Sequence, residues 1–197
     1  SHPGPAQLVL MFGRRRVGKS ELLLQWAMQS GLSYTYWEAV KENATQQRTR
    51  LFARLLNVPV PSAPVYRSWP EVWDAAAPIL QGKHHILILD ELPYIADADS
   101  AMLSALQYAC DQHFQKSEIV IVLCGSHVRV MEALFDRQSP LFGRMTAQWH
   151  LEPLPFSSLI EFFPKWYVDE RVAAYAILVG IPAYLNWLDP ELDLIGN

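Results

Sequence analysis

The 197-residue sequence contains little cysteine, little net charge and no long apolar run. Its two cysteines, Cys110 and Cys124, lie in segments that we expect to be core, which indicates reduced thiols and a cytoplasmic location. The formal net charge of -4 gives no whole-chain reason to expect binding to nucleic acid or to an anionic membrane. No apolar run reaches transmembrane length and no signal peptide is evident, so we expect no membrane partner.

The sequence also lacks internal repeats and low-complexity tracts, which argues against a solenoid or a disordered chain. Hydrophobic residues make up 51% and charged residues 18% of the chain, which is enough apolar material for a substantial core. The length suits one domain, or one domain with a small appendage.

The phosphate-binding pattern G-x-x-x-x-G-K-[ST] lies close to the start of the chain. Its residues, with the one that follows, are Gly13, Arg14, Arg15, Arg16, Val17, Gly18, Lys19, Ser20 and Glu21. An apolar run over 7–12 precedes the pattern, and a helix-forming stretch without Pro or Gly follows it over 21–28. Strand, glycine-containing turn and helix form the structural context that this motif requires.

The chemistry of the loop suits a nucleoside triphosphate. Gly13 and Gly18 allow a tight turn, and the loop N–H groups and the helix N-terminus offer partial positive charge to an anion. We expect Lys19 to reach the β- and γ-phosphates and the Ser20 hydroxyl to bind Mg²⁺. The alternative is an ordinary loop with a surface lysine, and the flanking strand and helix favour the nucleotide site.

Two acids follow a continuous apolar run over 85–89, which is typical of a strand buried on both faces. Ligands of open α/β sheets bind outside the carboxyl ends of the strands. Asp90 is therefore placed to hold Mg²⁺, directly or through water, and Glu91 to orient an attacking water. The alternative is a solvated acidic turn, which the nearby phosphate loop disfavours.

A second β-branched run, over 118–124, ends at Ser126, which we expect at the same edge of the sheet as Asp90. The Ser126 hydroxyl could contact the γ-phosphate or the attacking water. Alternatively, Ser126 caps a helix predicted over 128–135. The residues alone do not decide between these two roles.

The remaining pattern predicts a three-layer α/β/α fold with a mainly parallel five-stranded sheet and a small C-terminal helical lid. Further strands are predicted over 32–38 and 146–151, and further helices over 46–56, 69–81, 100–113, 156–163 and 170–179. We expect a nucleotide-binding α/β domain over 1–152 and a lid over 153–197 that is incomplete at its C-terminus.

Over almost its whole length the chain resembles the archaeal-type P-loop ATPases, a family near the AAA+ and STAND groups. The segments that carry the resemblance are 13–23, 88–94, 125–126, 139–144 and 180–185. It implies that Lys19 and Ser20 are the Walker A pair, that Asp90 and Glu91 are Walker B, and that Ser126 is the sensor-one residue.

The resemblance assigns roles to two further residues. Arg144 follows Pro-Leu-Phe-Gly and matches an arginine finger directed at a neighbouring subunit, which implies a homo-oligomer and weak hydrolysis by the isolated chain. The alternative is an arginine that braces its loop against Glu152 or Glu161. Pro182 matches the G-x-P turn that packs on the adenine in STAND proteins.

The chain departs from its relatives in three respects. They carry an upstream Arg-Glu box, usually have a glycine where Val179 stands, and continue into a winged-helix region. No arginine stands at the G-x-P turn, so the chain has no evident counterpart there of the sensor-two arginine that AAA+ proteins usually carry. We therefore expect missing N- and C-terminal segments, and a protein or DNA partner would bind through the C-terminal one.

These observations predict Mg²⁺-dependent binding of ATP and its hydrolysis to ADP and phosphate. A rival hypothesis from a different class is a nucleotide-gated switch that holds ATP or ADP and hydrolyses slowly. A third is a P-loop kinase for a small molecule, and the acidic pair and the absence of an arginine-rich lid helix argue against it.

Overall fold

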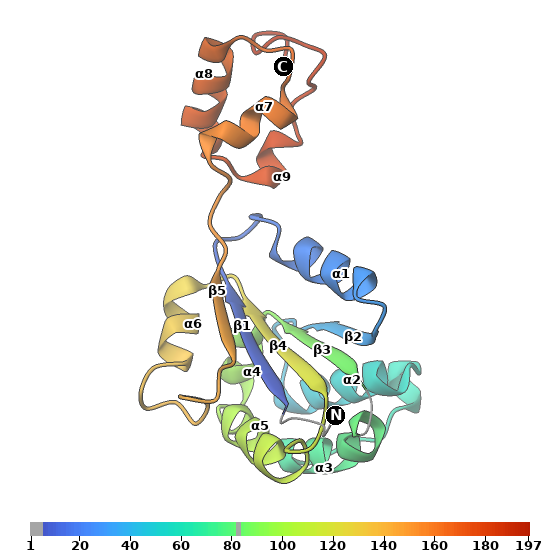
Figure 1. Ribbon diagram of the computed structural model, residues 1–197. Helices are drawn as coiled ribbons and strands as arrows, with labels where there is room; N and C mark the ends of the chain where they lie inside the picture. The colour runs from blue at the N-terminus through green and yellow to red at the C-terminus, as the bar shows by residue number, and fades with distance from the viewer. Residues whose placement is uncertain (1–5, 82–83) are drawn as a thin grey trace.

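The computed structural model describes residues 6–81 and 84–197, so the first five residues of the predicted α/β domain lie outside it. Five strands form one sheet in the order β2-β3-β4-β1-β5 (Figure 1). Their bounds are β1 (Gln7–Phe12), β2 (Ser33–Glu38), β3 (His85–Asp90), β4 (Ile119–Gly125) and β5 (Ala147–His150). Every pairing is parallel, which confirms the predicted α/β class.

The register of the sheet brings the carboxyl ends of its strands together. Phe12 at the end of β1 pairs with Gly125 of β4 and with His150 of β5. Asp90 at the end of β3 pairs with Glu38 of β2. Chain segments far apart in sequence therefore meet at one edge of the sheet, which we call the carboxyl edge.

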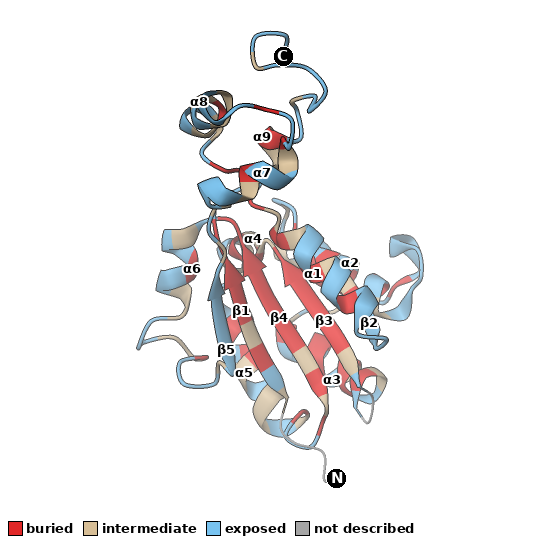
Figure 2. Cartoon of the chain, turned by 45° about the horizontal axis from the view of Figure 1, so that its top comes forward, coloured by how far each residue is buried: buried red, intermediate tan, exposed pale blue. Residues whose placement is uncertain are grey.

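The two faces of the sheet are covered unequally (Figure 2). Helix α1 (Lys19–Gln29) covers one face over a small apolar cluster that includes Leu23, Ala27 and Ile88. The other face carries α2 (Ala44–Leu56), α3 (Trp69–Leu80), α4 (Leu92–Ala98), α5 (Ala101–Gln112) and α6 (Val128–Leu134) over the main core. The 3-10 turn η1 (Val60–Ser62) connects α2 to α3.

Helix boundaries follow local chemistry. Helix α3 has a side-chain cap, since the Ser68 hydroxyl accepts the Glu71 N–H at 3.4 Å, and Pro70 occupies the first turn. The short helix α4 was not predicted, because it begins directly after Asp90 and Glu91 and carries Pro93 in its first turn.

The lid comprises the 3-10 turn η2 (Phe156–Ser158), α7 (Leu159–Phe162), α8 (Val168–Leu178) and α9 (Pro182–Leu185). The single helix predicted over 156–163 is wrong, because a 3-10 turn occupies its start and α7 is only four residues long. Helix α8 begins earlier than predicted. Glu170 is not its first residue, and the Glu170 carboxylate instead accepts the Tyr167 N–H at 2.8 Å.

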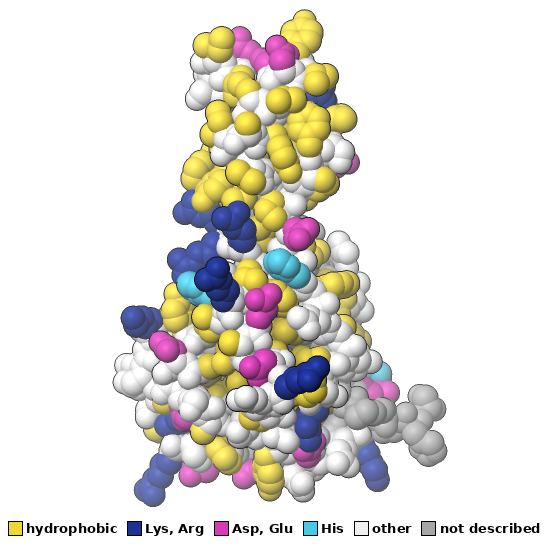
Figure 3. Space-filling model, turned by 90° about the vertical axis from the view of Figure 1, so that its left-hand side faces the viewer, with side chains coloured by type: hydrophobic (Ala, Val, Ile, Leu, Met, Phe, Trp, Pro, Cys, Tyr) yellow, Lys and Arg dark blue, Asp and Glu magenta, His cyan; other side chains and the backbone are white. Residues whose placement is uncertain are grey.

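The lid has an apolar cluster of its own, formed by Leu159, Phe163, Trp166, Ala174 and Leu185. Figure 3 shows hydrophobic side chains over much of the lid surface on the face in view. The separate cluster supports the division at 152/153, which stays a prediction. Among the residues that the structure describes, no helix has the length and apolar character needed to cross a membrane.

Candidate nucleotide site

The phosphate loop connects β1 to α1 and has the strand-turn-helix context that the sequence predicts. Gly18 has a φ of 95°, a left-handed conformation that residues with a side chain rarely adopt. This explains why the motif has a glycine at its second fixed position. Gly13 is required for a different reason. A Cβ there would lie 2.1 Å from the backbone oxygen of Leu151, the residue that follows β5.

Lys19 lies across the loop with only 6% of its surface exposed. Its ammonium donates to the backbone oxygens of Gly13, at 2.9 Å, and Arg14, at 3.0 Å. These contacts keep the buried charge satisfied inside the loop. The ammonium is thus within the loop whose N–H groups are expected to surround phosphate.

Ser20 and Asp90 are joined directly. The Ser20 hydroxyl donates to Asp90 Oδ2 at 2.5 Å, although 70 positions separate the two residues. The other carboxylate oxygen accepts the Glu91 N–H at 2.8 Å, and Asp90 is 2% exposed. A hydroxyl that donates to a carboxylate keeps its lone pairs for a cation, so this oxygen pair fits Mg²⁺.

A second polar pair lies beside the first. Glu91 Oε2 accepts the Ser126 hydroxyl at 3.0 Å and the Ser126 N–H at 3.3 Å. Arg15 Nε donates to the same hydroxyl at 3.4 Å, and the Arg15 guanidinium also donates to the Tyr94 hydroxyl at 3.0 Å. Ser126 does not cap α6, whose N-cap is His127 and has no side-chain cap bond, so the capping alternative is wrong.

The backbone of Glu91 is itself unusual. Its φ is 53°, in the left-handed region, where residues other than glycine are strained. The conformation turns the chain sharply between β3 and α4, and Glu91 lines the cavity described below. Strain at a candidate base is consistent with a position fixed for chemistry rather than for stability.

Burial raises the pKa of two groups around Asp90, and the Asp90 charge raises both pKa values further. The Tyr36 hydroxyl has a pKa raised well above its usual range by burial, by the Asp90 charge and by its hydrogen bond to Asp90. The Cys124 thiol has its pKa raised by the same causes in the same order. Both groups therefore stay protonated at neutral pH, and the Tyr36 hydroxyl donates to Asp90 at 2.8 Å.

The phosphate loop and the carboxyl ends of the strands line one cavity of about 900 Å³. The phosphate loop contributes Arg15, Arg16, Gly18, Lys19, Ser20 and Glu21, the strand ends and α4 contribute Glu38, Glu91, Tyr94 and Ser126, and the segment after β2 contributes Ala39, Val40 and Lys41. The lid contributes Pro182, Ala183 and Asn186 to the lining. Pro182 thus lies where a base-contacting residue was predicted, although its role toward adenine stays a prediction.

The other predicted loop residues lie around the cavity rather than in its lining. Gly13 and Arg14 contribute the backbone oxygens that hold Lys19, and the Arg14 side chain lines a neighbouring cavity of about 410 Å³. Val17 is buried at 5% exposure. Asp90 lies behind Ser20 and faces the cavity through it.

The phosphate loop also contacts the lid. The Arg16 guanidinium lies 5.3 Å from the ring centroid of Tyr184 and 5.5 Å from that of Trp187. These are cation–π distances, and the contact joins the loop to the far side of the cavity. Arg16 has a φ of 67°, which makes it the second left-handed residue of the site apart from glycines.

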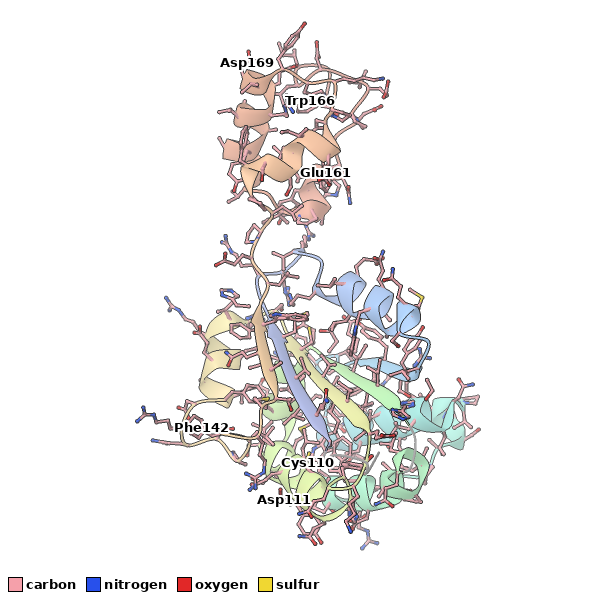
Figure 4. All side chains as sticks on the ribbon, viewed as in Figure 1. Cys110, Asp111, Phe142, Glu161, Trp166 and Asp169 are labelled. Carbon is pink, nitrogen blue, oxygen red and sulfur yellow. The ribbon has the colours of Figure 1, made fainter. Side chains whose placement is uncertain are left out.

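Arg144 lies apart from this cavity. Its guanidinium donates to Asp111 at 2.7 and 3.2 Å, so the alternative in which Arg144 braces its loop named the wrong partners in Glu152 and Glu161. Figure 4 shows Asp111 at the lower end of α5 and Glu161 in the lid, at opposite ends of the molecule. Arg144 precedes β5, so it lies at the amino edge of the sheet. Its predicted role in a neighbouring subunit stays a prediction.

Sequence reasoning missed Tyr36, Tyr94 and the two lid aromatics. Tyr36 lies two residues before the end of β2, so the rule that identified Asp90 would also have placed it near the carboxyl edge. Tyr94 belongs to the unpredicted helix α4. The contact of Tyr184 and Trp187 with Arg16 depends on where the lid folds back, for which the sequence carries no signal.

Comparison with known proteins places this site in context. Residues 2–187 match the family described as an ATPase domain predominantly from Archaea. The chain is 31% identical over 200 residues to an uncharacterized protein, MJECL04, of Methanocaldococcus jannaschii. That match covers 97% of this chain and 43% of the relative, so the chain spans less than half of the relative's length.

Solved structures share the fold at low identity. The Walker-type ATPase PABY2304 of Pyrococcus abyssi is 20% identical with a TM-score of 0.60, over 90% of this chain and 60% of that one. The ORC1 protein of Aeropyrum pernix in complex with DNA is 14% identical with a TM-score of 0.60, over 91% and 52%. The ORC2 protein of the same organism, in ADPNP-ADP complexes, is 17% identical with a TM-score of 0.56, over 83% and 46%. The family match extends over nearly the whole sequence, and the chain therefore belongs to the archaeal P-loop ATPase family.

Proposed function

We propose that this chain binds ATP with Mg²⁺ and hydrolyses it to ADP and phosphate as a AAA+/STAND-like ATPase module. The observation that carries the proposal is the hydrogen bond between Ser20 and Asp90, beside Lys19 and Glu91 at one cavity. A loop with a surface lysine would not bring a buried ammonium, a hydroxyl and two carboxylates together from separate segments. Membership of an ATPase family supports the same activity.

Each group has a distinct role in this proposal. Lys19 and the loop N–H groups bind the β- and γ-phosphates, and Ser20 and Asp90 hold the cation. Bound Mg²⁺ supplies positive charge that neutralises the phosphate oxygens. Glu91 accepts a proton from the attacking water, and Ser126 holds the Glu91 carboxylate in place.

A single-turnover experiment tests the proposal. The protein is mixed in excess with ATP and Mg²⁺, and the formation of ADP and phosphate is followed by quenching and chromatography. We expect ADP to form at a rate that vanishes when EDTA removes the metal. Binding of ATP without any ADP formation would contradict hydrolysis, and the absence of binding would contradict the nucleotide site as well.

A second candidate function is a nucleotide-gated switch, which the contact of Arg16 with Tyr184 and Trp187 favours. A loop residue that contacts the lid can change the lid position when the loop binds phosphate. The two functions differ in their slow step. Release of ADP that is much slower than single-turnover hydrolysis would favour the switch, and rapid release would favour a turning-over ATPase.

We also propose that Arg144 acts on the nucleotide of a second subunit in a homo-oligomer. Exposure at the amino edge, away from its own cavity, supports an action in trans. Mixing Arg144→Ala with Lys19→Ala tests this in a longer protein that assembles. Recovered hydrolysis would support the proposal, and no recovery in a co-assembled mixture would contradict it.

The same longer protein would supply the binding region for a protein or DNA partner. The solved ORC1 relative in complex with DNA supports a DNA partner as one alternative. The two thiols support a cytoplasmic location, because no disulfide forms among the described residues.

A further inference from the structure

Tyr36 reaches the carboxylate at the centre of the candidate cation site. Its hydroxyl donates to Asp90 Oδ2 at 2.8 Å, and this is the same oxygen that accepts the Ser20 hydroxyl at 2.5 Å. Three separate segments thus meet on one oxygen: strand β2, strand β3 and the first turn of α1. This contact is not part of the phosphate-loop or Walker B patterns of the sequence.

The Asp90 carboxylate is fixed from both sides. The Glu91 N–H holds Oδ1 at 2.8 Å, while Ser20 and Tyr36 hold Oδ2. The last side-chain torsion of an aspartate is otherwise broad, so these donors decide how the carboxylate is turned. Removal of the Tyr36 hydroxyl leaves Ser20 as the sole hydroxyl donor to Oδ2 among these contacts.

The orientation of Asp90 controls the orientation of Ser20. As long as the Ser20 proton points at Asp90, the lone pairs of the serine oxygen face the cavity, where Ser20 is part of the lining. Partners that orient a metal ligand through a second group commonly change metal affinity by about 10- to 100-fold when removed. Tyr36 occupies such a place without lining the cavity itself.

We propose that Tyr36 is a positioning residue for Mg²⁺: through Asp90 it holds the Ser20 hydroxyl in the orientation that binds the cation. The inference rests on the proposed Mg²⁺–ATP function and extends it to a residue on the edge strand β2. It requires that loss of the hydroxyl weakens the metal-dependent part of nucleotide binding and leaves the metal-independent part unchanged. A residue that only stabilised the fold would not separate these two parts.

The variant Tyr36→Phe tests this, because it removes the hydroxyl and keeps the ring that packs on the cluster under α1. Binding of ATP is measured by calorimetry, first in EDTA and then over a series of Mg²⁺ concentrations. The matched control is Tyr34→Phe, which loses a hydroxyl on the same face of β2, two residues earlier. Circular dichroism and thermal melting report whether each variant is folded.

We expect Tyr36→Phe to bind ATP in EDTA within about twofold of the wild type. The Mg²⁺ concentration that gives half of the metal-dependent gain in affinity should rise by about tenfold or more, and Tyr34→Phe should show no rise. An unchanged Mg²⁺ requirement, or an equal loss of affinity with and without the metal, would overturn the role of Tyr36. A wild type that binds no ATP in either condition would instead overturn the proposed function.

Discussion

The two edges of the sheet carry similar charged groups in contrasting surroundings. At the carboxyl edge, Lys19 and Asp90 are 6% and 2% exposed; backbone oxygens of the phosphate loop hold Lys19, and donors from several segments hold Asp90. At the amino edge, Arg144 and Asp111 form one ion pair whose side chains are 36% and 39% exposed. Residue type alone therefore does not distinguish the candidate nucleotide site from a surface ion pair in this molecule.

The two edges differ in the free energy that is needed to place charged groups there. A buried charge without a partner is strongly unfavourable, so groups at the carboxyl edge require several exact contacts to exist there at all. An exposed ion pair has little influence on stability, because water solvates both members. The predicted consequences of substitution should therefore be large at the carboxyl edge and small at the amino edge.

The largest effect is expected from Lys19→Ala. The loop would lose the ammonium that we propose to contact the phosphates, and removal of one partner of a buried charge pair commonly weakens binding by roughly 100- to 1,000-fold. Calorimetric titration with ATP measures the loss. The matched control is Lys41→Ala, an exposed lysine that lines the same cavity. Equal ATP affinity in wild type and a folded Lys19→Ala would contradict the phosphate-loop assignment.

The next effect is expected from Glu91→Gln, which should retain binding of ATP and Mg²⁺ and slow hydrolysis by roughly a hundredfold or more. Loss of a general base affects the chemical step, so single-turnover kinetics is the appropriate measurement. Glu38→Gln, which changes an exposed carboxylate of the same cavity, serves as the control. Undiminished hydrolysis would mean that Glu91 is only a turn residue, and lost binding would mean that it helps to hold the metal.

A smaller effect is expected for the thiol at the amino edge. Burial, with the nearby Asp111 charge, raises the pKa of Cys110 to about 11. Because only the thiolate reacts, alkylation of Cys110 should accelerate about tenfold for each pH unit between about 8 and 10. Mass spectrometry after timed alkylation follows this rate. We expect the fully buried Cys124 to be alkylated more slowly than Cys110 in the folded protein, and the opposite order would contradict this prediction.

The smallest effect is expected from Arg144→Ala in the isolated chain. An exposed ion pair contributes at most about 1 kcal/mol to the free energy of unfolding, and the ATP affinity should stay within about twofold. Urea denaturation and calorimetry measure the two quantities, with Asp111→Ala as the matched partner variant. A loss of ATP affinity on the scale of Lys19→Ala would mean that the two edges are coupled within one subunit.

The sequence predicted the carboxyl edge well because its signals are local. The phosphate loop, the apolar run before Asp90 and the β-branched run before Ser126 each combine a strand with a polar end, and parallel strands bring such ends together. The ion-pair partners named in the alternative for Arg144 were wrong because Asp111 lies on α5, 33 positions earlier, and surface pairs carry no pattern. Tyr36 was missed because an aromatic residue in a strand is typical of a core position.

The lid was predicted as helical, and its helix limits were the least accurate part. Its segments are short, so tertiary contacts rather than periodicity set their ends. The left-handed residues Glu91 and Val179 also escaped prediction, since neither is a type that favours that conformation. The backbone preferences of Glu and Val do not predict the conformation at either position, and Glu91 lines the cavity.

The close approach of Gly13 to Leu151 joins the phosphate loop to the segment that leads into the lid. The Leu151 N–H donates to the Phe12 oxygen at 2.7 Å, so the residue that leads into the lid is fixed to the start of the phosphate loop. Beyond it, Pro153 and Pro155 have locked φ torsions, and the Leu154 N–H is held by the Gly180 oxygen at 2.8 Å. The segment that connects β5 to the lid therefore has few free torsions, and it begins in contact with the first glycine of the phosphate loop.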